Sequence, residues 1–252
     1  MDKNGNHWRY SKRNSKGVQM YSIKRKLLSI DVGRDKRLKL NRLLAFSQEL
    51  SIKEMEGFGY SINTMDHNKL LFVIGKQRFI IHELPLFNKE IEMTTWSNKN
   101  LKSLFPKHYR MEGDHKLYIE GVAIWSLIHS KSRQYIPSSD FDMNITGEEK
   151  ENELSFPRKL IPPKLKLKAT LQANYSNCDM NGHINNASYI DFILGLIPIS
   201  YIKNHTPKML EIDYEKEIKL GTSVEVSYGR YKDAYWFYSD SFTIKLTFMK
   251  NE

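Results

Sequence analysis

Apolar residues recur in the first part of the chain with two different periods. Residues 17–32, "GVQMYSIKRKLLSIDV", alternate and are rich in β-branched side chains, which predicts a strand. A helix of three or more turns is predicted next, because leucines recur there at helical spacing: Leu40, Leu43, Leu44 and Leu50. The glycines of "EGFGYS", 56–61, end this helix.

Three strand-like runs follow, at 69–84, 88–98 and 107–130, separated by Gly, Asn, Asp and Lys. One helix followed by an antiparallel meander is typical of an α+β fold. From Pro137 the periodicity disappears, and the charged, proline-bearing segment that follows predicts a linker. We therefore expect a basic N-terminal segment at 1–16, a first domain at 17–140 and a linker at 141–162.

The remainder, 163–252, repeats this plan. Strands are predicted at 165–176, 209–221, 223–240 and 242–250, and a helix at 185–202. Superposing Asp31 on Asp179 aligns 29–44 with 177–192, and 88–96 falls on 221–229. This self-similarity predicts two copies of one fold, although chance similarity between two α+β halves is the alternative.

The predicted second helix is apolar around most of its circumference. From Ala187 onward only Ser188, Asp191 and Gly195 are polar or small, and their spacing places them on one narrow stripe. Such a helix is expected to be wrapped by other structure, as a curled antiparallel sheet would do.

Composition indicates a soluble globular protein in a reducing compartment. The chain has 252 residues, of which 40% are hydrophobic, and a single cysteine, Cys178. No apolar run approaches the roughly 20 residues needed to span a bilayer, and the basic N-terminus lacks the apolar core of a secretion signal, so we expect a cytoplasmic location.

The formal net charge of +10 is concentrated in residues 1–42. A local basic face predicts an acidic partner, which could be nucleic acid, an anionic membrane or an acidic protein. The alternative is a solvated tail followed by ordinary surface lysines. Nucleic acid is disfavoured, because the basic region lacks aromatic residues arranged for base stacking.

A polar cluster precedes the second predicted helix, in "CDMNGHINNASY", 178–189. Helix capping accounts for one Asn or Asp, but not for the whole set: Asp179, Asn181, His183, Asn185 and Asn186. A His in a first helical turn faces the positive end of the helix dipole, which favours the neutral imidazole that acid–base chemistry uses. Amides at the same helix end could stabilise an oxyanion. We therefore expect a functional site here.

This cluster resembles the Asp-x-Asn-x-His-x-Asn-Asn-x-x-Tyr motif of the acyl-acyl-carrier-protein thioesterases, a hotdog-fold family. "EIEMTTW" (90–96) and "IDYEKEIKLG" (212–221) resemble further family segments. So does "EGVAIWSLIHSKSRQYIP" (120–137), although it has a changed order at 124–126 and His129 in the place of an Asp. The resemblance extends from about residue 17 to the C-terminus.

The resemblance implies a tandem (double) hotdog fold, each half a helix wrapped by an antiparallel sheet. It also implies an active site formed by Asp179, Asn181, His183 and Glu217, with no metal and no cofactor apart from the phosphopantetheine arm of the substrate. The alternative for Glu217 is an ordinary surface residue on a strand where Glu211, Glu215 and Glu217 alternate.

The implied reaction is thioester hydrolysis without a cysteine nucleophile. Many family members have a Cys after the catalytic Glu, where this chain has Ile218, and Cys178 is expected to be a small buried residue. Water would attack with Glu217 or His183 as base, Asp179 orienting its partners and Asn181 positioning the water or the carbonyl. Direct attack by a carboxylate stays open.

The same alignment predicts that the first copy has lost this chemistry. Asp35 falls at the place of His183 and Gly33 at that of Asn181, so one active site per chain is expected. The first hotdog would then supply the wall of the acyl-chain pocket, through its strands and its helix around Leu43, Ala45 and Phe46.

The partner implied by the family is acidic acyl carrier protein. Eight basic residues are predicted to dock it: Lys24, Arg25, Lys26, Arg34, Lys36, Arg37, Lys39 and Arg42. Two rivals remain, a hotdog acyl-coenzyme A thioesterase and a catalytically silent acyl-binding hotdog. Hotdog dehydratases act on the same carrier, but the spacing resembles that of the hydrolases. The sequence leaves pairing into a homodimer open.

Overall fold

The computed structural model describes residues 9–15, 18–98, 100–140 and 154–251. Its eleven strands pair antiparallel in one sheet, in the order β1-β2-β4-β5-β6-β3-β8-β11-β10-β9-β7. Their bounds are β1 Arg9–Ser15, β2 Val18–Lys26, β3 Leu70–Ile81, β4 Glu90–Ser97, β5 Leu104–Gly113, β6 Lys116–His129, β7 Leu167–Gln172, β8 His205–Tyr214, β9 Ser223–Tyr231, β10 Ala234–Tyr238 and β11 Phe242–Lys250.

The sheet consists of two halves that meet at β3 and β8, six strands in the first half and five in the second. β3 of the first half pairs with β8 of the second, from Lys76 opposite Asp213 to Ile80 opposite Met209. Outward from this junction the strands follow the same sequence, β6-β5-β4-β2 on one side and β11-β10-β9-β7 on the other. The predicted tandem of two α+β units is confirmed.

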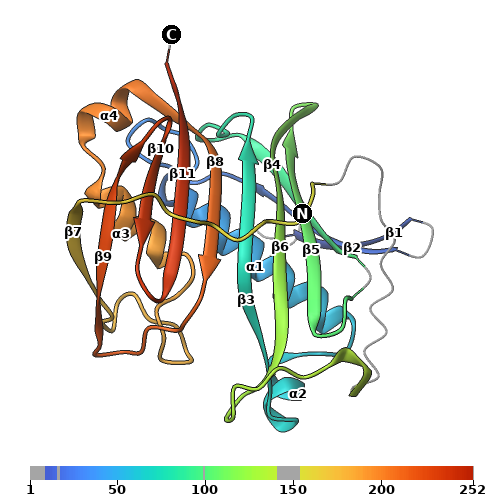
Figure 1. Ribbon diagram of the computed structural model, residues 1–252. Helices are drawn as coiled ribbons and strands as arrows, with labels where there is room; N and C mark the ends of the chain where they lie inside the picture. The colour runs from blue at the N-terminus through green and yellow to red at the C-terminus, as the bar shows by residue number, and fades with distance from the viewer. Residues whose placement is uncertain (1–8, 16–17, 99, 141–153, 252) are drawn as a thin grey trace.

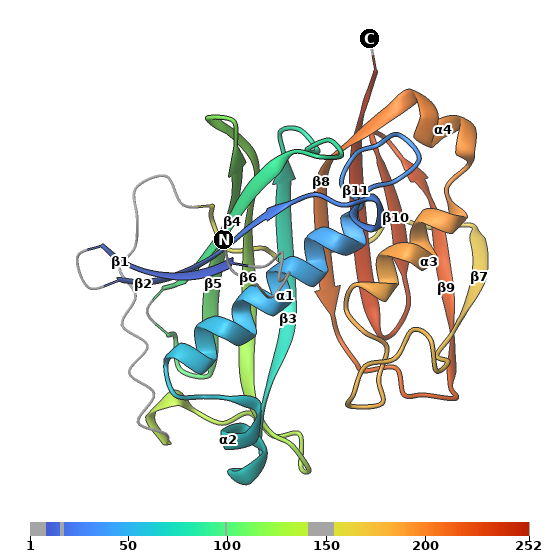
Figure 2. The same ribbon diagram turned by 180° about the vertical axis from the view of Figure 1, so that it is seen from behind.

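The helices are α1 Leu40–Gly57, α2 Ile62–His67, α3 Ser188–Leu196 and α4 Ile199–Asn204, with short 3-10 turns η1 Ser29–Asp31 and η2 Ser138–Asp140. Figures 1 and 2 show α1 and α3 on the same face of the sheet, one over each half. α1 buries its leucine face, with Leu43 and Leu50 fully inaccessible. Gly59, at φ +95°, follows its end, a conformation that favours glycine. Within the described residues no helix is long and apolar enough to cross a membrane.

The single helix predicted at 185–202 is wrong, because the structure has two shorter helices there. α3 ends at Leu196 and α4 begins after Pro198, whose missing amide hydrogen cannot continue an α-helix. α3 buries Tyr189, Ile190 and Ile193, whereas Phe192 is only partly covered. The sheet therefore covers one side of α3 and leaves the other partly open.

The connection between the halves crosses the outer face of the sheet. Residues 141–153 of the predicted linker lie outside the described part of the chain, and 154–166 contain no helix or strand. Figure 1 shows this segment running in front of the strands toward β7. It is held by Arg78, which donates to the carbonyl of Ser155, and by Asp213, which accepts the amide of Leu160 at 2.8 Å.

The predicted N-terminal segment is partly continuous with the first half. Residues 1–8 and 16 lie outside the described ranges, but 9–15 form β1, which pairs along its whole length with β2. Those seven residues are therefore an edge strand, where the sequence had suggested a separate basic segment.

Backbone hydrogen bonds show how the two copies correspond before their helices. The amide of Gly33 donates to the carbonyl of Arg37, and that of Asp179 donates to the carbonyl of His183, both at 2.8 Å. Lys39 donates to Asp31 in the same way that Asn185 donates to Asn177. The two loops are thus related by a shift of 146 residues, since 183 − 37 = 146.

The predicted superposition of Asp31 on Asp179 is therefore wrong by two residues. Asp31 corresponds to Asn177, and both side chains cap a turn: the amide of Leu28 donates to Asp31 at 2.9 Å and that of Asn174 to Asn177 at 2.8 Å. The predicted match of 88–96 with 221–229 is confirmed, because the amide of Lys89 donates to the carbonyl of Leu86 as that of Thr222 donates to Lys219.

Candidate active site

The loop between β7 and α3 is ordered by the carboxylate of Asp179. Its Oδ1 accepts the amide of Asn181 at 2.9 Å and that of His183 at 3.4 Å, while Oδ2 lies 3.4 Å from the Asn181 carboxamide nitrogen. Gly182, at φ +74°, makes the turn between them. Asp179 therefore holds the short loop that carries both Asn181 and His183.

His183 and Glu217 are brought together by a second backbone contact. The amide of Ile184 donates to the carbonyl of Ile218 at 3.0 Å, which sets the two segments side by side. His183 Nε2 then lies 3.6 Å from Glu217 Oε2, with side-chain exposures of 18% and 36%. The structure thus brings all four predicted catalytic residues to one place.

Two local expectations about these residues are wrong. Glu217 lies in the loop after β8, which ends at Tyr214, and not on a strand. α3 begins at Ser188, so His183 precedes the helix by five residues and does not face its dipole from the first turn. The Asn185 side chain accepts the amide of Ala187 at 2.8 Å, in the turn that leads into α3.

The His183 ring is held asymmetrically. Nε2 faces Glu217, whereas Nδ1 is buried and has no hydrogen-bond partner among the described residues. Tyr189, the last residue of the motif, packs edge-on against Tyr214 and Phe242. Burial raises the pKa of the Tyr189 phenol, and the carboxylate of Glu217 raises it further, so Tyr189 stays protonated near neutral pH.

Cys178 immediately precedes Asp179 in this loop. It is half-buried, and its thiol lies 3.7 Å from the carbonyl oxygen of the Asn177 side chain. Ile218, at the position of the family's cysteine, is 2% exposed. The expectation that Cys178 is buried is therefore wrong in part, because its side chain keeps some exposure, and its lack of a nucleophilic role stays a prediction.

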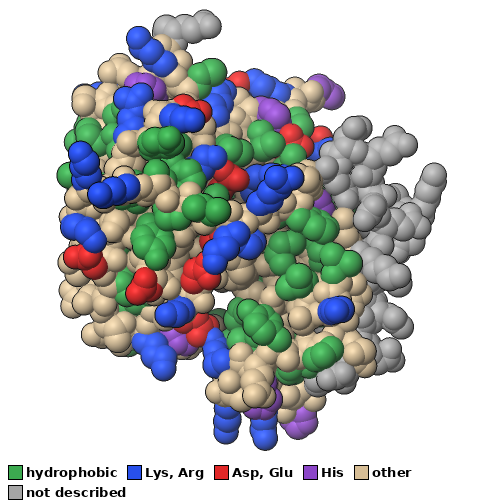
Figure 3. Space-filling view, in the orientation of Figure 1, with side chains coloured by type: hydrophobic (Ala, Val, Ile, Leu, Met, Phe, Trp, Pro, Cys, Tyr) green, Lys and Arg blue, Asp and Glu red, His purple; other side chains and the backbone are tan. Residues whose placement is uncertain are grey.

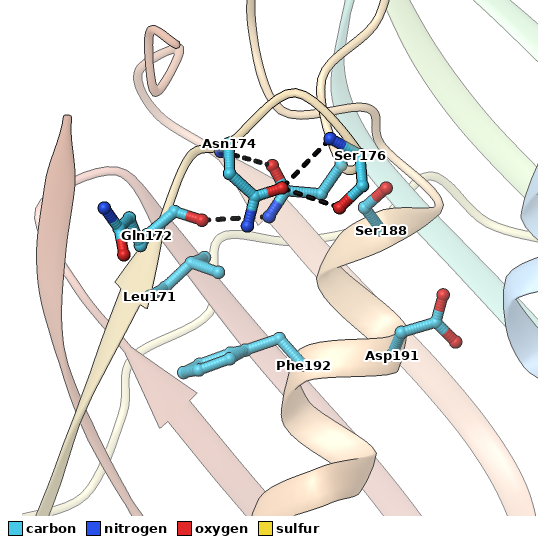
Figure 4. A pocket seen from close by; sticks show the side chains of 8 residues that line it. Leu171, Gln172, Asn174, Ser176, Ser188, Asp191 and Phe192 are labelled. Atoms are coloured by element: carbon cyan, nitrogen blue, oxygen red, sulfur yellow. Dashed lines mark hydrogen bonds between the residues drawn. The ribbon is translucent and has the colours of Figure 1, made fainter. Parts of the chain in front are cut away.

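A hollow of about 420 Å³ lies beside the site, between the end of β7 and α3 (Figure 4). None of the four predicted catalytic residues lines it. Its lining is mostly polar: Leu171, Gln172, Asn174, Ser176, Asn177, Ser188, Asp191 and Phe192. Asn174 accepts the amide of Ser176, as a dashed line in Figure 4 shows, and the Asn177 side chain donates to the carbonyl of Gln172 at 2.9 Å. This hollow is therefore separate from the four predicted catalytic residues, although Asn177 in its lining lies two residues before Asp179.

The predicted wall of the acyl pocket lies in the core of the first half. Leu43 and Phe46 are buried, and Ala45 is partly covered. The Phe46 ring lies under two guanidinium groups, with its centroid 4.9 Å from Arg25 Cζ and 5.2 Å from Arg42 Cζ. A role for these residues in holding an acyl chain stays a prediction.

Arg25 is wrong as a docking residue, because it is 5% exposed and bonded to the buried carboxylate of Asp31 at 2.5 Å. Arg42 binds the other oxygen of Asp31 at 3.0 Å. The docking role of the remaining seven is untested. Five are exposed on the surface, and Arg37 and Arg42 are half-buried: Lys24, Lys26, Arg34, Lys36, Arg37, Lys39 and Arg42.

Strand pairing separates most of these cations from His183. The end of β2 lies beside the start of β4, where Lys26 is opposite Glu90. Because neighbouring strands run antiparallel across the whole sheet, β7 and β8 finish at the opposite strand ends. The loop 27–39 and the loop that carries His183 therefore lie at opposite ends of the strands, and Figure 2 shows the loop 27–39 beside α4. A ten-residue strand such as β8 spans about 30 Å between these two ends.

One functional candidate was missed by the sequence analysis. Arg133, in the turn after β6 of the first half, contacts Glu217 Oε2 through its guanidinium. It falls on the Arg of the resembled segment 120–137, which was the available signal. Figure 3 shows His, acidic and basic side chains gathered beside a notch at the lower rim of the molecule.

The chain is similar to known proteins both in sequence and in fold. Two sequence models of one family match the chain, the acyl-ACP thioesterase N-terminal domain over 19–140 and the C-terminal domain over 162–247. These limits nearly coincide with the predicted domains. The chain is 23% identical to an oleoyl-acyl carrier protein thioesterase of Arabidopsis thaliana over 78% of its own length and 60% of the relative's. For an acyl-[acyl-carrier-protein] hydrolase of Cuphea viscosissima the figures are 20%, 78% and 51%.

The chain spans about half to three-fifths of the length of these relatives. Two solved structures share its fold. An acyl-ACP thioesterase from Bacteroides thetaiotaomicron superposes with a TM-score of 0.78 at 19% identity, covering 91% of this chain and 98% of that one. A 12:0-ACP thioesterase from Umbellularia californica gives 0.79 at 13% identity, covering 92% and 98%. The double hotdog and the two matched domains together place this chain in the acyl-ACP thioesterase family.

Proposed function

We propose that this chain hydrolyses the thioester of acyl-acyl carrier protein, releasing free fatty acid and the carrier. The observation that carries the proposal is the pairing of His183 Nε2 with Glu217 Oε2 at 3.6 Å, on a loop that Asp179 holds in place. Family membership supports the substrate class. No cofactor enters the proposal beyond the phosphopantetheine arm that carries the acyl group.

The proposed reaction is attack by water on the thioester carbonyl carbon. The proton of the water passes to the pair formed by Glu217 and His183, and the bond from carbon to sulfur breaks. The departing thiolate takes up a proton, which leaves a free acid and the thiol of the arm. Asn181 is exposed and can donate its carboxamide hydrogen to the developing oxyanion. Direct attack by the Glu217 carboxylate is the competing route, which would give an anhydride.

The carrier must approach the strand ends where His183 and Glu217 lie. Lys216 and Lys219 are exposed on either side of Glu217 and can meet an acidic surface. We therefore infer that docking involves these lysines more than the cations of the loop 27–39.

The proposal is tested by measuring fatty acid release from a panel of acyl-carrier and acyl-coenzyme A thioesters by the purified protein. Wild type is expected to prefer the carrier-bound substrates, and His183→Ala to abolish release from both. Preference for coenzyme A would favour the acyl-coenzyme A thioesterase. Binding of acyl groups without turnover in either protein would favour a silent acyl-binding hotdog.

A further inference from the structure

Arg133 joins the two halves of the molecule at the active site. It lies in the turn 129–134 of the first half, and its guanidinium contacts Glu217 Oε2 in the second half. The same oxygen faces His183 Nε2 at 3.6 Å. We propose that Arg133 is a positioning residue, which holds the Glu217 carboxylate against His183 and makes the first hotdog part of the active site. This inference rests on the proposed function.

The turn that carries Arg133 is tightly hydrogen-bonded. The amide of Arg133 donates to the carbonyl of His129 at 2.9 Å, and the amide of His129 donates to that of Gln134 at 2.9 Å. Arg133 itself adopts φ +61°, an uncommon conformation for a residue other than glycine. The amide of Ser130 donates to the carbonyl of Lys69 at 2.8 Å, which joins the turn to the residue that precedes β3.

The His129 side chain accepts backbone amides of the turn, as an Asp side chain commonly does. Its Nδ1 accepts the amides of Lys131 and Ser132, both at 3.2 Å. Asp side chains commonly accept backbone amides two residues ahead, and a neutral imidazole nitrogen offers the same lone pair. This explains how the chain tolerates His129 where the resembled segment has Asp: the acceptor is kept, and with it the turn that presents Arg133.

Two consequences follow for the chemistry. The Glu217 side chain is 36% exposed, so without a partner it would sample several rotamers in solvent. Its negative charge would also oppose an oxyanion forming nearby, and the guanidinium offsets that charge. Asp179, the other carboxylate of the site, is bonded to backbone amides of its own loop. Arg133 is therefore the cation that both aims and partly neutralises Glu217.

The test is a double-mutant cycle between Arg133 and Glu217. Arg133→Gln is expected to lower kcat by about 10- to 100-fold, the scale of a misplaced reacting group, with little change in KM. Arg133→Lys should recover part of the loss. In the Glu217→Gln background, Arg133→Gln should cause no further loss, because its partner is already gone. Lys131→Gln is the matched control, since it removes an exposed cation from the same turn and should leave kcat unchanged.

His129 gives a second set of variants for the same inference. His129→Asp should keep kcat near that of wild type, and His129→Ala should lower it only where Glu217 is intact. The unfolding midpoints should stay close to that of wild type for Arg133→Gln, because a part-exposed ion pair contributes little stability. Wild-type kcat in Arg133→Gln, or an equal fold-loss with and without Glu217, would overturn the inference.

The outcome can be separated from failure of the proposed function. If wild type releases no fatty acid, the proposed function fails, and the cycle is then read from the NMR chemical shifts of the His183 ring at one fixed pH. Those shifts should change with Arg133→Gln and should not change further once Glu217 is Gln. Unchanged shifts in both backgrounds would overturn the positioning role.

Discussion

Arg37 occupies in the first half the position that His183 occupies in the second. The carbonyl of each accepts the amide four residues before it at 2.8 Å, and each is followed by a residue whose amide bonds the returning chain, Leu38 to Pro85 and Ile184 to Ile218. On this register Gly33, Asp35 and Leu84 stand at the places of Asp179, Asn181 and Glu217, since 217 − 84 = 133 and 218 − 85 = 133. One scaffold is therefore present twice, and the four predicted catalytic side chains once.

Asp31 should matter for folding and not for chemistry. Its carboxylate is fully buried and bonded to Arg25 and Arg42. Removing one member of a buried ion pair leaves an uncompensated charge, so Asp31→Ala should lower the free energy of unfolding by about 3–5 kcal/mol. Urea denaturation measures this loss. Asp35→Ala, at an exposed place in the same loop, is the control, and equal losses in the two variants would contradict the assignment.

Cys178 should be dispensable for hydrolysis. No thiol stands at position 218, and Cys178 contacts Asn177 on the side of the loop that precedes Asp179. Cys178→Ala should keep kcat within about a factor of three of wild type, because no covalent step passes through sulfur. Steady-state rates, with trapping of any acyl-enzyme by acid quench, decide the matter. An acylated Cys178 in the quenched protein would sink the water-attack route.

Carrier docking can be tested by changing the basic residues at each of the two opposite ends of the strands. Lys216→Glu with Lys219→Glu should raise the apparent KM for acyl-carrier substrates about tenfold and flatten or reverse its salt dependence, because the variant loses the attraction that salt screens. The control neutralises three cations in the loop 27–39, at the opposite strand ends: Arg34→Gln, Lys36→Gln and Lys39→Gln. A KM effect confined to the triple variant would return the docking surface to the loop 27–39.

Buried tyrosines should make the fold sensitive to alkali. Burial raises the pKa values of Tyr109, Tyr189 and Tyr214 above the ordinary value of 10.0. Because the folded pKa lies above the unfolded one, the stabilisation is complete below about pH 10 and is lost as pH rises beyond it. Urea midpoints between pH 8 and pH 11 should fall in wild type and fall less in Tyr189→Phe. Tyr175→Phe, 92% exposed, should behave as wild type.

Much of the fold could be predicted because periodicity is a local property of the chain. The leucine spacing of α1, the strand runs and the match of 88–96 with 221–229 all follow from which face of each element is buried. The break at Pro198 was visible in the sequence but was outweighed by the apolar run around it. The two-residue error at Asp31 arose because identical residue types were matched, whereas the loops correspond through backbone hydrogen bonds that no residue type specifies.

The candidate site likewise contains local relationships, which could be predicted from the sequence, and long-range contacts, which could not. Asp179, Asn181 and His183 lie within one short motif, so their proximity could be inferred from the sequence. The contact of Arg133 with Glu217 joins positions 84 residues apart, in different halves, since 217 − 133 = 84. The burial of Arg25 likewise depends on Asp31 and on the packing of α1, and net charge counts cannot reveal it.

The symmetry-related pair His183 and Arg37 tests the central claim most directly. Fatty acid release from acyl-carrier thioesters is measured for His183→Ala and Arg37→Ala, together with the urea midpoint of each variant. We expect His183→Ala to lower kcat by at least about 100-fold with an intact fold, the scale for loss of an acid–base group. Arg37→Ala should keep the wild-type kcat. Comparable losses in both variants, or full activity in His183→Ala, would contradict a single active site in the second half.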